Sequence, residues 1–538
     1  MGYYLNNAEV YTMYKEVADD LYFVDKTAML NELIPLIDTP QKYVCITRPR
    51  RFGKTVMANL IGAFFSKGCD ASTVFDHLNI AKYDSYRKHL NQYNVIYIDF
   101  SEMDDECKSY ASYISNIKAL LREDLHSAYH DVSFRKNGSI SEDLKRIYTA
   151  TRERFVFVLD EWDAIFHMPF IKEKDKLAYL NFLKNMLKGK VYVSFAYMTG
   201  ILPIAKYSSG SEINMFLEYT MATKKKYSEY FGFLDEEVDL LYDRYLKQVS
   251  VYNVSREGLR EWYDGYQTPG GKRMYNPRSV VCALKDNQLS NYWTSSGPYD
   301  EIFYYIRKNV EDVQDGLALM VSGESIMAMV EEYAATSMNL STKNEIYSAM
   351  LVYGFLSYEN GRIRIPNKEL MDKFGNMLRK ENSQGYVFRL AKESDRMLQA
   401  TLNGDTQTMA GILEYAHNTE IPLLSYNNET DLTAVVSLVY LAARDYYRIE
   451  REDKAGIGYV DFIFYPNDKR ADCIILELKV DHSAKEAIQQ IKKKKYALRF
   501  KGKLGEQSLY SGRILAVGIS YNKNTKKHSC MIEELENI

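Results

Sequence analysis

The feature that most constrains this chain is a basic segment that contains glycine and directly follows an apolar run. The apolar run covers residues 43–46, and the basic segment covers residues 48–55, closing with Gly53, Lys54 and Thr55. A β-strand that leads into a basic loop ending in Gly-Lys-Thr is the layout of a phosphate-binding loop. A helix that begins near Lys54 would point its free N–H groups and its positive dipole end at a phosphate. The segment therefore predicts a phosphate site between a strand and a helix.

The side chains of this loop suggest separate roles. Lys54 would reach the β- and γ-phosphates, and Thr55 would place its hydroxyl on Mg²⁺. Arg48 stands where the pattern has its first glycine, which predicts a wider loop made partly of arginines. The alternative is a solvated basic loop, since Gly-Lys-Thr also occurs by chance. The sequence does not decide whether Arg50 or Arg51 contacts phosphate. The expected nucleotide contacts in the loop are Arg50, Arg51, Phe52, Gly53, Lys54 and Thr55.

A second segment supports the nucleotide interpretation. Residues 155–159 are continuously apolar and are followed by Asp160 and Glu161. Such a run is typical of a central parallel strand that is buried on both faces. Asp160 can hold Mg²⁺ through water, and Glu161 can polarise the water that attacks the γ-phosphate. The alternative is a strand that ends in a polar turn. Two such motifs in this order predict ATP binding.

The first part of the chain alternates apolar runs with helical segments, which predicts an α/β fold with a parallel sheet. Thr199 follows the last of these runs. It could sense the γ-phosphate, or it could simply end a strand. The expected strands cover residues 43–47, 95–100, 155–159 and 191–198.

Composition limits the class of protein. The chain has 538 residues, 46% of them hydrophobic and 26% charged, which suggests an ordinary folded protein of roughly three domains. The formal charge of -3 means that a nucleic-acid site must be a local basic patch. The six cysteines are scattered, which fits a reducing cytoplasm. The sequence shows no signal segment and no run near the ~20 apolar residues of a membrane span, so we expect a cytoplasmic protein without a membrane partner.

The middle of the chain has a helical pattern. Residues 346–353 read as an apolar helix, Asn360 and Gly361 as a hairpin turn, and Asn367 as the cap of a further helix. Helix, hairpin and helix in this order resemble a winged-helix unit. Such a unit could contact DNA or serve only as a packing module.

The last part of the chain holds a second group of chemical residues. Residues 456–465 and 474–480 predict a hairpin with Asp461 on the first strand and Glu477 and Lys479 on the second. Side chains two residues apart on a strand share a face, so Glu477 and Lys479 lie together. Two carboxylates could hold one or two Mg²⁺ ions, or Mn²⁺, and Lys479 could stabilise charge during phosphodiester hydrolysis.

Flanking helices could complete this site. Glu429, on the preceding helix, could supply a further metal ligand. Gln490 could reach back to the metal, and the lysines at 492–495 could track a phosphate backbone. The alternatives are a surface ion pair for Glu-x-Lys and a solvated helix face for the lysine run.

Taken in order, these motifs resemble the AAA-ATPase-like family of bacterial proteins, which belongs with the STAND-type P-loop ATPases. The C-terminal part resembles the PD-(D/E)XK nuclease domain that these proteins carry, and in the family an Arg replaces the first P-loop Gly. Together the similarities cover nearly the whole chain. They lie at residues 22–27, 48–55, 160–161, 199–200, 262–266, 275–277, 292–293 and 365–367.

The resemblance implies a P-loop ATPase domain at 1–230, a helical and winged-helix-like region at 231–390, and a restriction-endonuclease-like α/β domain at 391–538. Asp160 is then expected on Mg²⁺ and Glu161 as the catalytic base. The nuclease signature carries over onto Asp461, Glu477 and Lys479, with Glu429 and Gln490 as further candidates. Two positions depart from the pattern. They are Trp162, where Tyr is expected, and Tyr459, where Arg is expected and a fixed cation is lost.

The expected function is ATP binding and hydrolysis coupled to metal-dependent DNA cleavage, with the middle region passing the nucleotide state to the nuclease domain. The alternative is a STAND-type switch or scaffold whose nuclease-like domain binds DNA or a partner without cutting. A motor is less favoured, because no arginine finger is evident; Arg278 is a candidate second sensor. The chain could also form a homo-oligomer.

Overall fold

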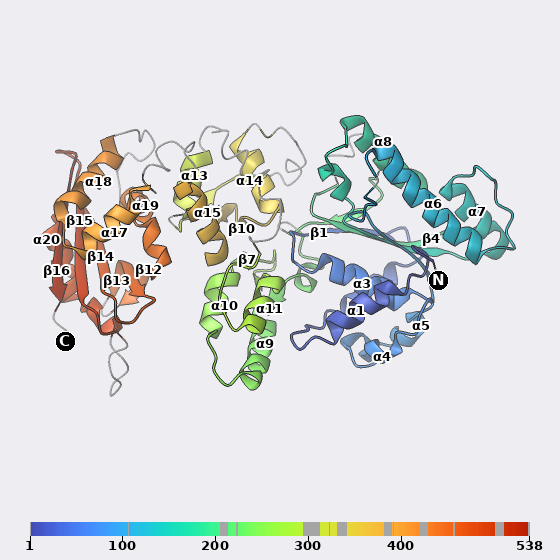
Figure 1. Ribbon diagram of the computed structural model, residues 1–538, viewed down its shortest axis with the longest axis horizontal. Coiled ribbons are helices and arrows are strands. Elements are labelled where there is room, and N and C mark those ends of the chain that lie inside the picture. Colours follow the sequence, from blue (N-terminus) through green and yellow to red (C-terminus); the bar gives the residue numbers. More distant parts are fainter. Residues whose placement is uncertain are drawn as a thin grey trace. The chain divides into compact units, whose positions relative to one another are not determined.

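Figure 1 shows the computed structural model of the chain, which divides into two compact units. One unit comprises Met1–Pro298 and Ala328–Glu369, and the other comprises Tyr299–Met327 and Leu370–Ile538. The domain boundaries expected at 230 and 390 stay predictions. The structure describes residues 2–105, 107–204, 213–221, 224–293, 313–321, 323–330, 340, 342–380, 390, 392–418, 429–455, 458–500 and 510–535.

The first unit is built on a parallel sheet with the strand order β2-β3-β4-β1-β5. Because the strands are parallel, their carboxyl ends meet at one edge, where ligands bind in folds of this kind. The four expected strands are confirmed, and β5 is an addition that its short sequence does not reveal. The strands are β1 (Tyr43–Thr47), β2 (Asn94–Asp99), β3 (Phe155–Asp160), β4 (Val193–Gly200) and β5 (Leu217–Tyr219).

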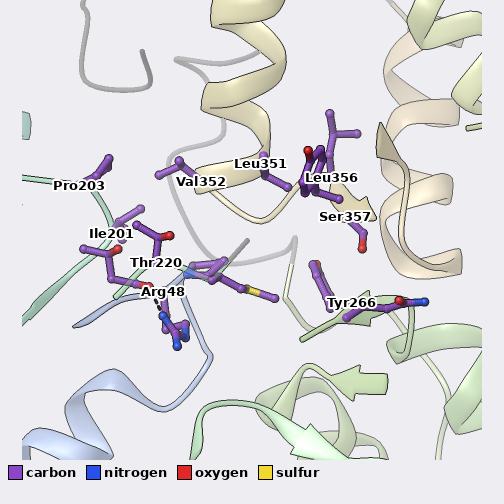
Figure 2. Close-up of a pocket in the computed structure, with 14 residues that line it drawn as sticks. Arg48, Ile201, Pro203, Thr220, Tyr266, Leu351, Val352, Leu356 and Ser357 are labelled. Carbon is purple, nitrogen blue, oxygen red and sulfur yellow. Dashed lines mark hydrogen bonds between the residues drawn. The ribbon is translucent and has the colours of Figure 1, made fainter. Parts of the chain in front are cut away.

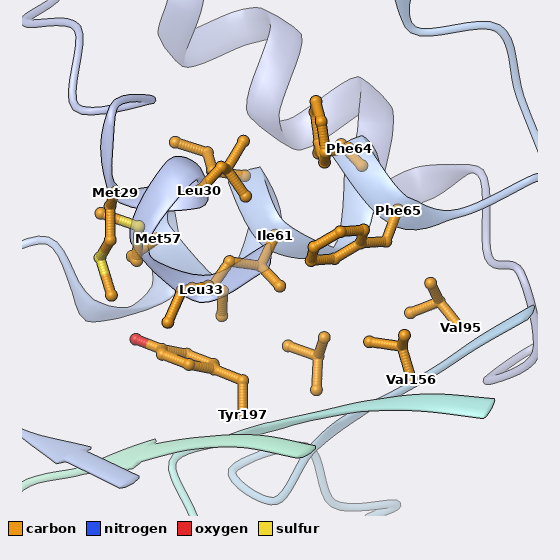
Figure 3. Packing of buried hydrophobic residues seen from close by; sticks show 14 of the residues in the cluster. Met29, Leu30, Leu33, Met57, Ile61, Phe64, Phe65, Val95, Val156 and Tyr197 are labelled. Atoms are coloured by element: carbon orange, nitrogen blue, oxygen red, sulfur yellow. The ribbon is translucent and has the colours of Figure 1, made fainter. Parts of the chain in front are cut away.

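Helix α3 (Lys54–Phe65) begins at the basic loop and packs on one face of this sheet (Figure 3). Ile61 and Phe65 of α3 lie against Val156 and Tyr197 of the sheet, and all of these side chains are buried. This packing fixes the start of α3 beside the carboxyl ends of the strands. The other helices of this region are α1 (Glu9–Ala18), α2 (Met29–Leu33), α4 (Ser72–Phe75), α5 (Tyr86–His89), α6 (Tyr110–Ala128), α7 (Ile140–Thr151) and α8 (Glu173–Leu187).

The rest of the first unit is mainly helical. A small antiparallel sheet has the order β6-β8-β7. Helix α14, the hairpin β10–β11 and helix α15 follow one another as the sequence predicts. The elements are α9 (Asp235–Gln248), α10 (Arg256–Tyr263), α11 (Pro277–Asp286), α14 (Lys343–Val352), β6 (Phe233–Leu234), β7 (Tyr266–Gln267), β8 (Arg273–Tyr275), β10 (Ser357–Glu359) and β11 (Arg362–Arg364). Helix α15 (Lys368–Lys380) begins in this unit, and its residues from Leu370 onward belong to the second unit.

The second unit contains a mixed sheet with the order β12-β13-β14-β15-β16, in which β14 and β15 are parallel and the other pairs antiparallel. Helix α20 (Ala484–Lys493) connects the two parallel strands and packs on them. This is the restriction-endonuclease-like α/β domain that the sequence predicts. The strands are β12 (Tyr447–Ala455), β13 (Gly458–Pro466), β14 (Cys473–Val480), β15 (Ile514–Asn522) and β16 (Lys527–Leu535), and further helices are α13 (Val313–Val321), α17 (Ser394–Leu402), α18 (Thr406–Asn418) and α19 (Glu429–Val439).

Helix length and polarity bear on membrane insertion. Among the helices in the described ranges, none is long and apolar enough to cross a bilayer.

Candidate functional site

A cavity of about 840 Å³ lies at the carboxyl edge of the parallel sheet, against the start of α3. Its volume suits a small-molecule ligand or cofactor. The P-loop, defined here as residues 48–55, supplies Arg50 to Thr55 to its wall. Asp99, Glu161 and Asp163 add carboxylates from the ends of β2 and β3. The expected phosphate site is therefore hollow and lined by both signs of charge.

The end of the P-loop has the geometry that its glycine permits. Gly53 has φ +88°, in the left-handed region that favours glycine, and it forms the N-cap of α3. The next residue, Lys54, is buried, and its Nζ donates to the Pro49 carbonyl at 3.3 Å. The same Nζ lies 3.7 Å from Glu161 Oε1. Lys54 therefore stands between the loop and the proposed catalytic carboxylate.

The arginines of the P-loop divide into two groups. Arg48 is buried, and its guanidinium donates to the carbonyls of Thr47 at 2.7 Å and Tyr219 at 2.8 Å. Arg48 therefore ties β1 to β5, which explains why an arginine suits the position of the first loop glycine. Arg50 and Arg51 line the large cavity, so both stay candidates for the phosphate contact.

An acidic edge faces the start of α3. Asp99 and Asp160 are register partners at the ends of β2 and β3. Burial, the neighbouring Asp99 and then Glu161 raise the pKa of Asp160 to about 8, against smaller opposing effects of Thr55 and Lys54. Within the described residues, Asp160 Oδ2 is buried and makes no hydrogen bond of ordinary geometry. A cation bound beside Asp160 would stabilise its ionised form.

The turn after β3 is clamped to the turn after β4. Glu161 has φ +47°, which is uncommon for a residue other than glycine. Two residues on, the buried Asp163 carboxylate accepts hydrogen bonds from the backbone N–H groups of Ile201, at 3.1 Å and 3.2 Å, and Leu202, at 2.7 Å. Gly200 has no room for a Cβ, which would lie 2.2 Å from Asp163 Oδ1. Asp163 therefore fixes the backbone that presents Glu161.

Sequence reasoning missed Asp99 and Asp163 as site residues. Asp99 was visible only as a polar residue that ends an apolar strand, and that signal could have found it, because parallel strands end at the same edge. Asp163 acts through the backbone of residues 201 and 202, so its role depends on tertiary structure and has no local pattern.

Thr199 lies at the end of β4, between β3 and β1. Its hydroxyl donates to the Ile46 carbonyl at 2.9 Å. This bond favours a structural role for Thr199, and phosphate sensing stays a prediction.

Two further segments line the large cavity. From the N-terminal segment, Tyr22 and Phe23 contribute apolar surface and Lys26 contributes a partly buried cation. Lys26 Nζ donates to both Glu237 oxygens at 2.6 Å and 2.7 Å and to the Glu229 carbonyl at 2.8 Å. From α11, the wall includes Arg278, Val281, Cys282 and Lys285. Arg278 thus lies at the cavity, as a candidate second sensor must.

The second unit brings together the residues of the expected nuclease signature. Asp461 lies on β13, and Glu477 and Lys479 lie on β14. Asp461 Oδ2 accepts from the backbone N–H of Leu478 at 2.7 Å, and Lys479 Nζ lies 3.3 Å from Glu477 Oε1. Gln490 of α20 donates its side-chain amide to the same Glu477 oxygen. Gln490 therefore reaches the carboxylate pair as predicted.

Two family models match the chain. Residues 12–209 match the model described as "Predicted AAA-ATPase", and residues 428–529 match the model described as "PD-(D/E)XK nuclease superfamily". The chain pairs an AAA-ATPase-like segment with a PD-(D/E)XK nuclease-like segment. In general terms, such domains use a nucleotide and a divalent metal ion.

Solved structures align with much of the chain at low sequence identity. A Walker-type ATPase of Pyrococcus abyssi is 13% identical with a TM-score of 0.38, and the alignment covers 65% of this chain and 94% of that one. The ORC2 protein of Aeropyrum pernix, in its ADPNP–ADP complexes, is 11% identical with a TM-score of 0.30, covering 68% and 93%. No curated protein matches the chain in sequence.

The residues of both segments fit a divalent cation whose remaining ligands are water and substrate phosphates. Across the described ranges, no group of three or more His, Cys, Asp or Glu side chains is arranged to hold a metal ion. Mg²⁺ is usually bound by one or two carboxylates together with water and substrate phosphates. In the AAA-ATPase-like segment, the buried Asp160 Oδ2 beside Thr55 supplies such a donor.

In the nuclease-like segment the corresponding candidate donors are Asp461 and Glu477. Burial and the nearby Asp461 raise the pKa of Glu477 to about 7, although Lys479 and Lys494 lower it. Glu477 Oε2 is buried and has no hydrogen-bond partner among the described residues. Glu429 begins α19, but its side chain lies outside the described part of the chain.

Proposed function

We propose that this chain is an ATPase that uses ATP to regulate metal-dependent cleavage of DNA by its nuclease-like domain. The ATPase part rests on the convergence of Lys54, Thr55 and Glu161 on one large cavity, with Asp160 buried beside them. Those side chains are the ones needed to bind a triphosphate, hold its cation and polarise a water molecule.

The side chains of the site act in a defined order in this proposal. Lys54 Nζ lies 3.7 Å from Glu161 Oε1. A bound γ-phosphate attracts the Lys54 ammonium and leaves Glu161 to accept a proton from the attacking water. Thr55 and Asp160 would hold Mg²⁺, which when bound would neutralise negative charge on the nucleotide phosphates.

Nucleotide binding and hydrolysis test the ATPase part with Lys54→Ala and Glu161→Gln. We expect Lys54→Ala to lose ATP binding, and Glu161→Gln to bind ATP while hydrolysis falls about 10²–10⁴-fold. Lys67 and Glu123 are exposed residues of the same unit, so Lys67→Ala and Glu123→Gln are matched controls that leave both activities unchanged. Hydrolysis that survives Glu161→Gln contradicts the assignment of the base.

The nuclease part rests on the buried Glu477 beside Asp461 and Lys479. Asp461 and Glu477 would hold the metal ion, which when bound would supply an activated water for attack on a phosphodiester. Lys479 stabilises the negative charge that develops on the phosphate, and Lys494, which also acts on Glu477, adds positive charge near the site. DNA binding by Asp461→Asn without cleavage would support these roles.

A second candidate function follows from Tyr459. Its side chain is 66% exposed on β13, at the position where the nuclease pattern has an arginine. Without that cation, the nuclease-like domain could bind DNA or a partner without cleaving DNA. The chain would then be a STAND-type ATPase that switches slowly between nucleotide states. This alternative predicts ATP-dependent capture of DNA with no cleavage by the wild-type protein at any metal concentration.

A further inference from the structure

The P-loop is held from outside the parallel sheet. Phe52 is fully buried, and its ring packs edge-on against Tyr266 of β7, with centroids 5.0 Å apart and planes at 87°. The Phe52 carbonyl accepts from the backbone N–H of Gly232 at 3.2 Å. Residues far along the chain therefore shape the middle of the P-loop.

A second contact reaches the start of the P-loop. Gly354, which follows α14, has φ +85°, and a Cβ at this position would lie 2.6 Å from Pro49 Cβ. The buried Tyr266 hydroxyl donates to the Gly354 carbonyl at 2.7 Å. Pro49, Phe52, Tyr266 and Gly354 thus form a closed set of contacts between the P-loop and the connection from α14 to β10.

The contact at Pro49 bears directly on the nucleotide site. The Pro49 carbonyl accepts the hydrogen bond of Lys54 Nζ at 3.3 Å. A shift of Pro49 therefore moves the acceptor that positions the phosphate-binding lysine. Because Phe52 lies between Pro49 and Lys54 in the chain, Tyr266 restrains the same segment from its other side.

The packing at this junction leaves a small gap. A cavity of about 30 Å³, large enough for about one water molecule, is lined by Arg48, Pro49, Tyr266, Leu351 and Leu356 (Figure 2). Figure 2 shows Leu351 of α14 and Leu356, just before β10, on the side opposite Arg48. This gap leaves space for α14 and the β10–β11 hairpin to change how they pack against the P-loop.

We propose that Tyr266 and Gly354 are positioning residues of the nucleotide site, which hold the P-loop through Phe52 and Pro49. This inference rests on the proposed ATP binding and names how it is regulated. ATP affinity depends on how the α14–β10 connection packs on the P-loop. Because linkage is reciprocal, bound ATP changes the stability of that packing by the same factor.

The matched pair Gly354→Ala and Gly271→Ala tests this inference. Gly271 lies in the β7–β8 turn with φ +80° and has nothing within 4 Å of a built Cβ. Both substitutions carry the cost of a left-handed alanine, but only Gly354→Ala presses on Pro49. By calorimetric titration of Mg-ATP, we expect Gly354→Ala to weaken ATP binding at least tenfold and Gly271→Ala to stay within twofold of wild type.

A second pair of substitutions, each of which removes one hydroxyl group, tests the inference if Gly354→Ala does not fold. Tyr266→Phe keeps the ring on Phe52 and removes the hydroxyl that donates to the Gly354 carbonyl. Tyr275→Phe removes a hydroxyl that donates to Asp235 at 2.6 Å and accepts from Arg256 at 2.9 Å, away from the P-loop. We expect about fivefold weaker ATP binding for Tyr266→Phe and unchanged affinity in Tyr275→Phe, with a loss of Tm in both variants.

The outcomes separate this inference from the proposed function. Folded Gly354→Ala and Tyr266→Phe proteins that bind ATP as tightly as wild type would overturn it, as would equal losses of affinity in Tyr266→Phe and Tyr275→Phe. A wild-type protein that binds no ATP would instead defeat the proposed function.

Discussion

Asp99 and Asp160 are paired in register at the carboxyl ends of β2 and β3, so the half-buried Asp99 carboxyl, which lines the cavity, lies beside the buried Asp160 carboxyl. Burial raises the pKa of Asp99, with a further contribution from Glu161. Burial and Asp99 raise the pKa of Asp160 to about 8. A cation bound at this site would therefore relieve the electrostatic repulsion between the Asp99 and Asp160 carboxylates.

This relationship predicts the pH dependence of stability without metal or nucleotide. The pKa of Asp160 is raised in the folded protein, so its contribution is fully present below about pH 4 and is lost as the pH rises towards 8. Asp160→Asn removes that contribution. Urea denaturation in EDTA at pH 5, 6.5 and 8 should show the wild type losing stability relative to Asp160→Asn as the pH rises; parallel curves would contradict the raised pKa.

The hydrogen bonds of Asp163 predict that removing its carboxylate lowers the rate of ATP hydrolysis more than it weakens ATP binding. Asp163→Ala leaves the N–H groups of Ile201 and Leu202 without their acceptor, which costs about 1–3 kcal/mol for each buried group. Because the same turn presents Glu161, we expect kcat for ATP hydrolysis to fall at least tenfold with a smaller change in KM. Asp175→Ala removes an exposed helix cap and is the control. Equal changes in kcat and KM would argue against positioning of Glu161.

The partly buried ion pair of Lys26 and Glu237 predicts an effect on folding. Lys26→Met leaves the Glu237 carboxylate, only 17% exposed, without its charged partner, and breaking such a pair costs up to about 3–5 kcal/mol. The double variant Lys26→Met/Glu237→Gln should recover part of this loss, because no uncompensated charge remains. Urea unfolding measures both; a cost below about 1 kcal/mol for Lys26→Met would show that the pair contributes little.

The nuclease-like site predicts metal binding that strengthens with pH. The pKa of Glu477 is about 7, and a metal ion binds the ionised carboxylate, so binding releases a proton. Between pH 6 and 8 the affinity for Mn²⁺ should rise about tenfold. Glu477→Gln should abolish this rise, whereas Glu486→Gln, at the exposed N-terminus of α20, should leave it unchanged. Affinity that does not vary with pH in the wild type would contradict the role of Glu477.

How far the sequence predicts the site depends on how local each signal is. Asp461, Glu477 and Lys479 follow from a strand pattern with a period of two, and the structure brings them together. The role of Arg48 could not be predicted, because its acceptor at Tyr219 lies on a three-residue strand without a recognisable pattern.

Long-range contacts account for the rest. The packing of Phe52 on Tyr266 joins two aromatic residues that nothing in the local sequence connects. The same holds for the clamp that Asp163 makes on the turn after β4. Strand ends and loop motifs identify the chemical groups, whereas the groups that orient them emerge only from tertiary packing.

The central claim is ATP-regulated cleavage of DNA, and a nuclease assay tests it most directly. Supercoiled plasmid and single-stranded DNA would be incubated with the protein and Mg²⁺ or Mn²⁺, with and without ATP, beside Asp461→Ala and Lys54→Ala. The account predicts cutting that disappears in Asp461→Ala, depends on ATP in the wild type and loses that dependence in Lys54→Ala. Folded, ATP-bound wild-type protein that leaves both substrates intact under every condition would contradict it.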